Sequence, residues 1–168
     1  MGFRTVDPRD LPGSLFHGLS ENWMLISAGG PEGYNTMTAS WGMAGVLWSR
    51  PTAEVFVRPQ RYTYGFMEQS EYFTCSFFGR DMRPALTYCG THSGREGDKA
   101  AATGLTPVFD RGSVYFAQAE TVLVLRKLYA QDLSGACFTD GEADAEHYPQ
   151  KDYHRAYVGE IVACLVRE

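Results

Sequence analysis

The order of predicted strands and helices limits the fold of this chain more than any other feature of its sequence. Short runs rich in β-branched and aromatic residues recur, and glycines and prolines separate them along the whole chain. These runs predict strands over residues 23–28, 35–41, 53–58, 72–78 and 157–166, with two strands or one bent strand between 114 and 133. Short helices are predicted over 63–69, 81–89 and 96–103.

The predicted strands outnumber the helices, and the two kinds of element do not alternate. A doubly wound sheet needs a helix between successive parallel strands, so this architecture is disfavoured. The pattern favours a mostly β fold, an antiparallel barrel with short peripheral helices. Because the 168 residues contain no internal repeat and no linker-like stretch, we expect a single domain over residues 1–168.

The charge and the cysteines narrow the classes of partner. The chain has 20 acidic and 15 basic residues, a net charge of −5, which argues against a nucleic-acid binder but not against one small phosphate ligand. No apolar run approaches the roughly 20 residues of a membrane span, and no signal peptide is visible. The four cysteines match no disulfide or zinc spacing. We therefore expect a cytoplasmic protein with free thiols and no membrane partner.

Familiar signatures of catalysis are missing from the sequence. It has no G-x-G-x-x-G, no phosphate-binding P-loop, no H-E-x-x-H and no G-x-S-x-G. These absences disfavour a Rossmann dehydrogenase, a P-loop enzyme and a hydrolase with a nucleophile elbow. The four histidines are scattered along the chain, and their spacing predicts no metal site.

Two segments could bind a planar, phosphorylated ligand. Residues 35–41, NTMTASW, form a predicted strand of small hydroxyl side chains that can hydrogen-bond a polar ring, although an ordinary threonine-rich strand has the same pattern. Arg58 and Arg61 precede Thr63 at a predicted helix start. Guanidinium groups and helix amides bind phosphate, whereas two solvated arginines at a turn would look the same.

A third segment, 93–99, places Ser93, Gly94 and Lys99 around a turn before a predicted helix. It could hold another part of a phosphorylated ligand, or be a solvated loop whose charges offset each other. Taken alone, each of the three segments is a weak indication. Their joint presence and order are more specific.

Four motifs together resemble the flavin reductase-like family of FMN-binding split barrels, including its flavoredoxin branch. They are NTMTASWG at 35–42, RPQRYTY at 58–64, CGTHSGREGDK at 89–99 and KDYHRAYVGEI at 151–161. The resemblance extends from about Trp23 to Val166, nearly the whole chain. It implies a homodimer of split β-barrels, with FMN bound near the interface between the protomers.

The resemblance also assigns residues to parts of the cofactor. The strand from Thr36 to Trp41 should run along the isoalloxazine ring, and the phosphate and ribityl regions should be held by residues of the other two segments. The contacts it implies are Thr36, Thr38, Ala39, Ser40 and Trp41 for the ring, Arg58, Arg61 and Thr63 for the phosphate, and Ser93, Gly94 and Lys99 for the ribityl-phosphate region.

The last motif contains the candidate catalytic residue, His154. We expect it to line the ring or a nicotinamide site, although a structural histidine at the start of the last strand is the alternative. Tyr153 precedes it where many family members have aspartate, so its usual neighbour is changed. Ile161 stands where the family pattern has valine.

The resemblance implies an FMN-dependent oxidoreductase that takes electrons from NADH or NADPH. It would pass them to free flavin or to a redox partner protein, while the flavin performs the redox chemistry. One alternative is an electron-transfer flavoprotein of flavoredoxin type, whose electron donor is a protein. A second alternative is a small β-barrel binding protein without a redox role.

Overall fold

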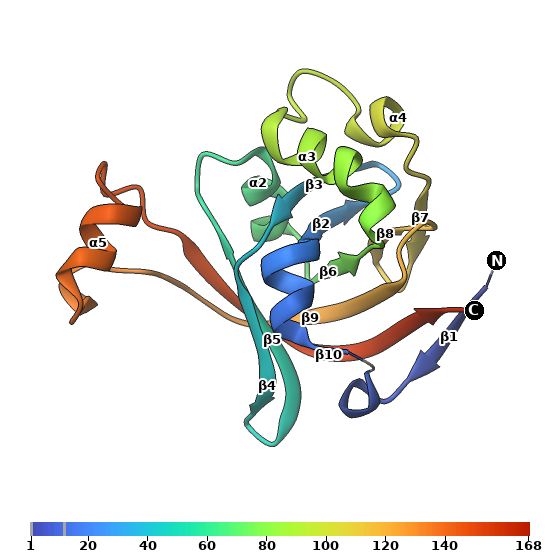
Figure 1. The fold of residues 1–168 in the computed structure, drawn as a ribbon, viewed down its shortest axis with the longest axis horizontal. Coiled ribbons are helices and arrows are strands. Elements are labelled where there is room, and N and C mark those ends of the chain that lie inside the picture. Colours follow the sequence, from blue (N-terminus) through green and yellow to red (C-terminus); the bar gives the residue numbers. More distant parts are fainter. Residues whose placement is uncertain (1, 12) are drawn as a thin grey trace.

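Strands dominate the computed structural model, which describes residues 2–11 and 13–168 (Figure 1). The mostly β fold with short helices is confirmed. The strands are β1 Phe3–Val6, β2 Met24–Gly30, β3 Gly33–Ala39, β4 Gly42–Leu47, β5 Arg50–Val57, β6 Tyr72–Phe77, β7 Pro107–Asp110, β8 Ser113–Phe116, β9 Thr121–Asp132 and β10 Arg155–Arg167. The helices are α1 Leu15–His17, α2 Tyr62–Gln69, α3 Arg83–Thr91, α4 Lys99–Thr103 and α5 Gly141–His147. Every predicted element is present, and the region 114–133 contains two strands, β8 and β9.

The main sheet is antiparallel and has the order β3-β2-β6-β9-β10-β5-β4, with β1 paired to β10. Strands β7 and β8 form a separate hairpin. The two ends of the main order, β3 and β4, are joined in the chain by Ser40 and Trp41 alone. The sheet must therefore curl until its ends approach each other, which produces a barrel that is open between them.

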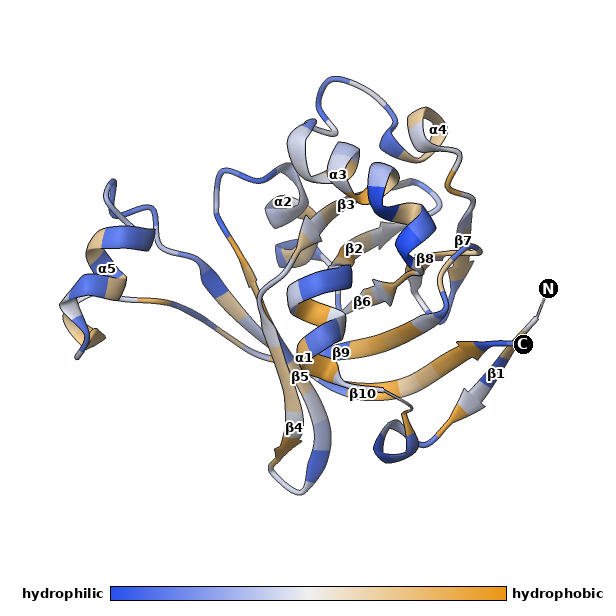
Figure 2. Cartoon of the chain, in the orientation of Figure 1, coloured by the Kyte–Doolittle hydropathy of each residue, from blue (hydrophilic) through white to orange (hydrophobic). Residues whose placement is uncertain are grey.

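Side chains on the two faces of the sheet pack into two separate hydrophobic layers. On β9, Leu123 and Leu125 join the barrel interior, whereas Val122 and Val124 join a second layer that includes Leu86 of α3. Side chains of a strand alternate between the faces of its sheet. Because residues 122–125 of β9 are covered on both faces, this part of the strand, VLVL, is apolar without interruption, and Figure 2 shows it in orange.

A hairpin of β4 and β5 projects away from the barrel (Figure 1). Its turn consists of Trp48 and Ser49, with φ angles of 51° and 60°. Two successive left-handed residues match the right-handed twist of the flanking strands. Met43, Val46 and Trp48 of this hairpin are exposed. The sequence did not reveal β4, because two glycines interrupt its apolar alternation.

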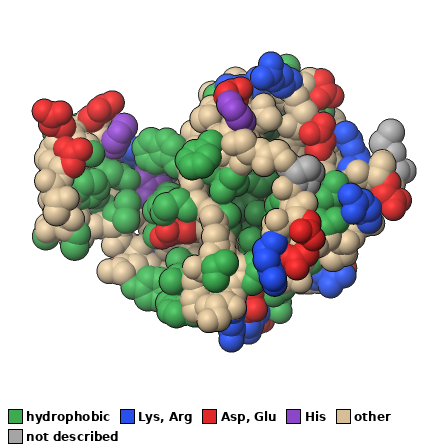
Figure 3. Space-filling model, turned by 60° about the horizontal axis from the view of Figure 1, so that its bottom comes forward, with side chains coloured by type: hydrophobic (Ala, Val, Ile, Leu, Met, Phe, Trp, Pro, Cys, Tyr) green, Lys and Arg blue, Asp and Glu red, His purple; other side chains and the backbone are tan. Residues whose placement is uncertain are grey.

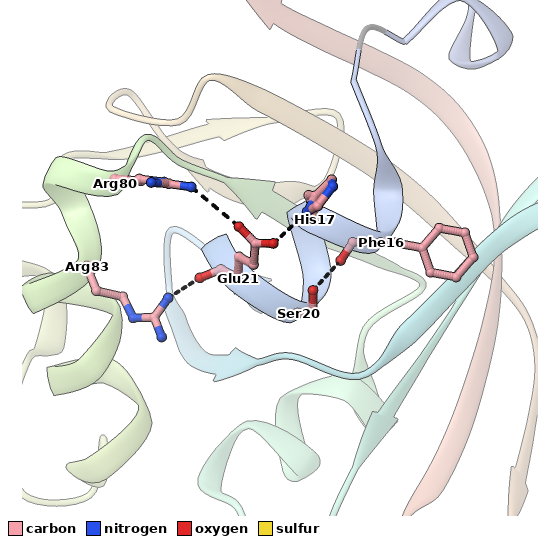
Figure 4. A network of polar contacts seen from close by, with 6 residues as sticks. All are labelled: Phe16, His17, Ser20, Glu21, Arg80 and Arg83. Atoms are coloured by element: carbon pink, nitrogen blue, oxygen red, sulfur yellow. Dashed lines mark hydrogen bonds and ion pairs between the residues drawn. The ribbon is translucent and has the colours of Figure 1, made fainter.

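A hydrogen-bonded network joins the N-terminal helix to the start of α3 (Figure 4). The Glu21 carboxylate lies 2.6 Å from Nδ1 of His17 and 3.3 Å from a guanidinium nitrogen of Arg80. The Arg83 guanidinium donates to the Glu21 carbonyl and also covers the ring of Trp23. The network leaves Phe16 pointing to solvent.

A second projection, which we call the arm, comprises residues 134–153 between β9 and β10 and includes α5 (Figure 1). The N–H of Leu133 donates to the carbonyl of His154 and closes the base of the arm. Asp140 caps α5 by accepting hydrogen bonds from the N–H groups of Glu142 and Ala143. The sequence analysis did not predict this helix. Within the described residues, no helix is long and apolar enough to cross a membrane.

Candidate functional site

A cavity of about 230 Å³ lies between the end of β3, the end of β5 and the residue before β10. It is lined by Met37, Thr38, Ala39, Ser40, Trp41, Phe56, Arg58, Arg61 and His154. A larger hollow of about 590 Å³ lies beside the N-terminal helix and β4, and its lining is mostly apolar. The smaller cavity is the better candidate site, because cationic, hydroxyl, aromatic and imidazole groups converge there. We call it the pocket.

One side of the pocket, which we call the body wall, consists of Thr38, Ser40 and Arg61. The N–H of Arg61 donates to the carbonyl of Arg58 in the turn after β5, at 3.0 Å. Its side chain donates to the carbonyl of Gly90 near the end of α3, also at 3.0 Å. Burial lowers the pKa of Arg61, although a guanidinium stays charged at neutral pH. Its remaining N–H groups are suited to bind an anion.

Buried groups support the body wall from behind. Lys99 is buried, and its ammonium donates to the carbonyls of Cys89 and Thr36 at 2.8 and 2.9 Å. Burial is the main cause that lowers the pKa of Lys99 to about 8. The hydroxyl of Thr38 donates to the carbonyl of Leu86. Lys99, Thr38 and Arg61 therefore join β3 and the turn after β5 to α3.

The opposite side, which we call the arm wall, consists of Trp41, Arg58 and His154, together with Tyr148 behind them. The Arg58 guanidinium donates to the Asp152 carboxylate and, at 2.9 Å, to the carbonyl of His147. Partial burial alone would raise the pKa of Asp152, but hydrogen bonds from Gln60 and Arg58 outweigh it and the pKa is lowered. Both terminal nitrogens of Arg58 therefore donate to the arm.

His154 lies between the arm and the barrel and is 8% exposed. Its ring centroid is 5.3 Å from that of Trp41, and its Nδ1 is 2.8 Å from the hydroxyl oxygen of Tyr148. Burial, aided by the positive charge of Arg58, lowers the pKa of His154 to about 4 against a smaller opposing effect of Asp152. The imidazole is therefore neutral near pH 7.

The structure brings seven of the predicted site residues together in the pocket lining: Thr38, Ala39, Ser40, Trp41, Arg58, Arg61 and His154. The other five lie outside this lining: Thr36, Thr63, Ser93, Gly94 and Lys99. Thr63 is buried and accepts a hydrogen bond from Asn35 at 2.8 Å, and Ser93 accepts one from the N–H of Arg95 at 3.2 Å. Direct ligand contact by these five stays a prediction.

The sequence analysis did not include Met37 and Phe56 of the lining, or Tyr148 behind it. Phe56 could have been found from strand alternation, because every second residue of β5 faces the same side. Tyr148 gives no such signal, since it lies in irregular chain after an unpredicted helix. No group of three or more His, Cys, Asp and Glu side chains within residues 2–11 and 13–168 could hold a metal ion.

Solved structures with the same fold share its open barrel. An FMN-binding protein from Thermus thermophilus with bound p-hydroxybenzaldehyde is 23% identical, covers 98% of this chain and 82% of its own, and gives a TM-score of 0.69. The flavoredoxin of Desulfovibrio vulgaris (Miyazaki F) is 22% identical. It matches 94% of this chain and 78% of its own, with a TM-score of 0.68. An NADH:FAD oxidoreductase from Streptomyces globisporus C-1027, in complex with NAD and FAD fragments, is 16% identical. The match covers 87% of this chain and 75% of that one, with a TM-score of 0.64. A search of curated proteins gave no match.

The curled antiparallel sheet and these structural neighbours place the chain in the class of split β-barrel proteins. A family model described as a flavin reductase like domain matches residues 16–168. Because the match covers most of the chain, this protein belongs to the flavin reductase-like family, as its sequence motifs predict.

Proposed function

We propose that the pocket binds FMN and that the protein is an oxidoreductase accepting electrons from NADH or NADPH. The observation that carries the proposal is the convergence of Arg61, Ser40, Trp41 and the neutral His154 on one cavity of a flavin reductase-like fold. The electrons would pass to free flavin or to a redox partner protein. The structural neighbour in complex with NAD and FAD fragments supports this assignment.

The residues of the pocket fit FMN in their chemistry. Arg61 supplies a charged fork for the phosphate, and its contact with Gly90 uses only part of that fork. The backbone and hydroxyls of Thr38 and Ser40 can hydrogen-bond the polar edge of the ring, while Trp41 and Phe56 provide apolar surface. Arg58 binds the arm, and we assign it a smaller share of the phosphate contacts.

When bound, FMN supplies the hydride-accepting ring and passes the electrons on one or two at a time. The protein's own residues orient the ring, exclude water and select the donor. His154 is neutral, so it does not act as a cationic proton donor at neutral pH. We assign it to hydrogen bonding with the electron donor on the arm side of the pocket.

A second copy of the chain is part of this proposal. The pocket, at about 230 Å³, is smaller than the roughly 300–1,000 Å³ typical of cofactor sites. On the face shown in Figure 3, hydrophobic side chains gather around a hollow. Val46 and Trp48 of the β4–β5 hairpin and Phe16 of α1 are all exposed. Covering such a surface favours a homodimer that completes each flavin site.

Flavin titration tests the proposal. FMN should bind roughly tenfold or more tightly than riboflavin, because a charged hydrogen bond to phosphate contributes on the order of 1.5–3 kcal/mol. Quenching of flavin fluorescence measures both affinities. Equal affinities would mean that the protein has no site for the phosphate. A protein that binds neither flavin would be a small β-barrel binding protein without a redox role.

An anaerobic titration separates the reductase from the electron carrier. NADH or NADPH added to the FMN-loaded protein should bleach the yellow absorbance of the flavin. The flavoredoxins among the structural neighbours favour the alternative, an electron-transfer protein with a protein donor. That alternative predicts that the flavin stays yellow with both nicotinamides.

A further inference from the structure

The arm contributes a buried tyrosine to the arm wall. Tyr148 is 4% exposed, and its hydroxyl oxygen lies 2.8 Å from Nδ1 of His154. The two rings meet almost edge-on, with centroids 5.6 Å apart and planes at 80°. Phe138 and Tyr153 pack against the tyrosine at centroid distances of 5.8 and 4.9 Å. This packing fixes the position from which the hydroxyl reaches the histidine.

The direction of the hydrogen bond follows from what each group can satisfy. Burial raises the pKa of Tyr148, so its hydroxyl is protonated, and a neutral imidazole has one N–H and one acceptor nitrogen. If Nδ1 carried the proton, the tyrosine hydrogen would have no acceptor among the described residues. An unsatisfied buried donor is unfavourable. Tyr148 therefore donates to Nδ1 of His154, and the imidazole proton lies on Nε2.

The charged and titratable groups around His154 keep the imidazole neutral. Arg58 comes from the end of β5, and Asp152 and Tyr148 come from the arm. His147 lies across Trp41, with ring centroids 5.3 Å apart. Arg58 opposes a second proton on His154 more strongly than Asp152 favours one. Nδ1 of His154 faces Tyr148 of the arm, and His154 also lines the pocket, so we infer that Nε2 is the ring nitrogen available to the pocket.

We infer that Tyr148 is a positioning residue that holds His154 in the tautomer presenting Nε2–H to the pocket. A fixed N–H donor is complementary to an acceptor oxygen on a planar ligand, such as the carboxamide of a nicotinamide. Tyr153, the residue before His154, serves a different purpose: its hydroxyl donates to Asp144 within the arm, at 2.9 Å. The effect on electron transfer rests on the proposed function, whereas the tautomer does not.

The tautomer can be measured on the protein without flavin or nicotinamide. Long-range ¹H–¹⁵N NMR spectra at pH 7 should show His154 with its proton on Nε2 and an acceptor Nδ1. Tyr148→Phe should populate both tautomers. Tyr153→Phe, which removes a neighbouring hydroxyl of the same arm, should leave the spectrum of His154 unchanged. A proton on Nδ1 in the parent, or equal spectra for the two variants, would overturn the inference.

The rate of flavin reduction provides the second measurement. His154→Ala should slow reduction by the nicotinamide roughly tenfold and change FMN affinity less. Tyr148→Phe should slow reduction roughly fivefold in the parent and not at all in the His154→Ala background. An equal loss in both backgrounds would show that Tyr148 does not act through His154. If neither nicotinamide reduces the flavin, the proposed function fails while the NMR spectra still decide the tautomer.

Discussion

Each wall of the pocket contains one arginine, but the two walls are held in different ways. In the body wall, Arg61 is fixed by the carbonyl of Gly90, and Thr38 by that of Leu86, both in α3. The arm wall is held by contacts to a projecting segment, chiefly the pair of Arg58 with Asp152. The body wall is therefore continuous with the core, whereas the arm wall depends on how the arm is seated.

This difference assigns different tasks to two arginines that lie three residues apart. Arg61 has donors to spare for a ligand, while Arg58 binds the carboxylate of Asp152 and the carbonyl of His147. We therefore expect affinity for the flavin phosphate to depend on the body wall. The geometry of the electron donor should depend on the arm wall.

The largest expected effect is an acid sensitivity located in the arm wall. The pKa of His154 is about 4 in the folded protein and 6.5 in the unfolded chain, so the unfolded chain binds more protons between these values. Above pH 6.5 the neutral His154 adds nothing unfavourable to the free energy of unfolding. As the pH falls from 6.5 to 4, proton uptake by the unfolded chain lowers that free energy by about 3 kcal/mol. Urea unfolding at a series of pH values measures this loss.

The comparison variant for this prediction is His154→Gln, which cannot take up the proton. Its free energy of unfolding should fall less steeply than that of the parent between pH 6.5 and 4. His147→Gln, which replaces the exposed histidine of the arm and keeps His154, is the control and should retain the steep fall of the parent. Parallel curves for the parent and His154→Gln would mean that His154 is not held neutral by its surroundings.

A second prediction sets the two arginines against each other. Arg61→Ala should weaken FMN binding roughly 10- to 100-fold, because it removes charged hydrogen bonds of about 1.5–3 kcal/mol from the body wall. Arg58→Ala should weaken it less, since that guanidinium is already bound to the arm. Fluorescence titration gives both affinities.

Arg95→Ala is the matched control for the two arginines. Arg95 is exposed, stacks on Tyr62 at 4.8 Å and does not line the pocket. Its loss should leave FMN affinity within about twofold of the parent. Equal losses for Arg58→Ala and Arg61→Ala would erase the distinction between the walls.

The sequence predicted the body of the fold better than its projections. Strands such as β9 are buried on both faces, so their apolar runs identify them. Strand β4 and helix α5 were missed. The first is exposed and contains Gly42 and Gly45, and the second is short and acidic, so neither shows the periodicity that burial imposes. Asp140 before α5 was a capping signal that could have been read.

The candidate site was also predicted in part: the motifs identified residues of the pocket but not the contacts that hold them. The motifs predicted Arg58 and Arg61 as equal partners of a phosphate, because spacing alone does not show which other groups compete for each guanidinium. Asp152 lies far from Arg58 in the chain, and its contact depends on how the arm folds back. Likewise, the hydrogen bond between Tyr148 and His154 follows from packing within the arm. Long-range competition of this kind cannot be read from a local motif.

The smallest expected effect concerns the seating of the arm itself. Asp152→Asn keeps the shape of the side chain and removes the charge that Arg58 binds. Amide hydrogen exchange in residues 134–153 should become a few times faster, because this pair is a main contact between arm and barrel. Exchange in β9 and α3 should stay unchanged. Asp132→Asn, which alters the pair with Arg155 at 2.8 Å near the base of the arm, is the control.

Asp152→Asn also frees Arg58 from the arm, so Arg58→Ala should weaken FMN binding more in the Asp152→Asn background than in the parent. If exchange in the arm and the effect of Arg58→Ala are both unaltered, Asp152 does not hold Arg58 to the arm, and the two walls are equivalent.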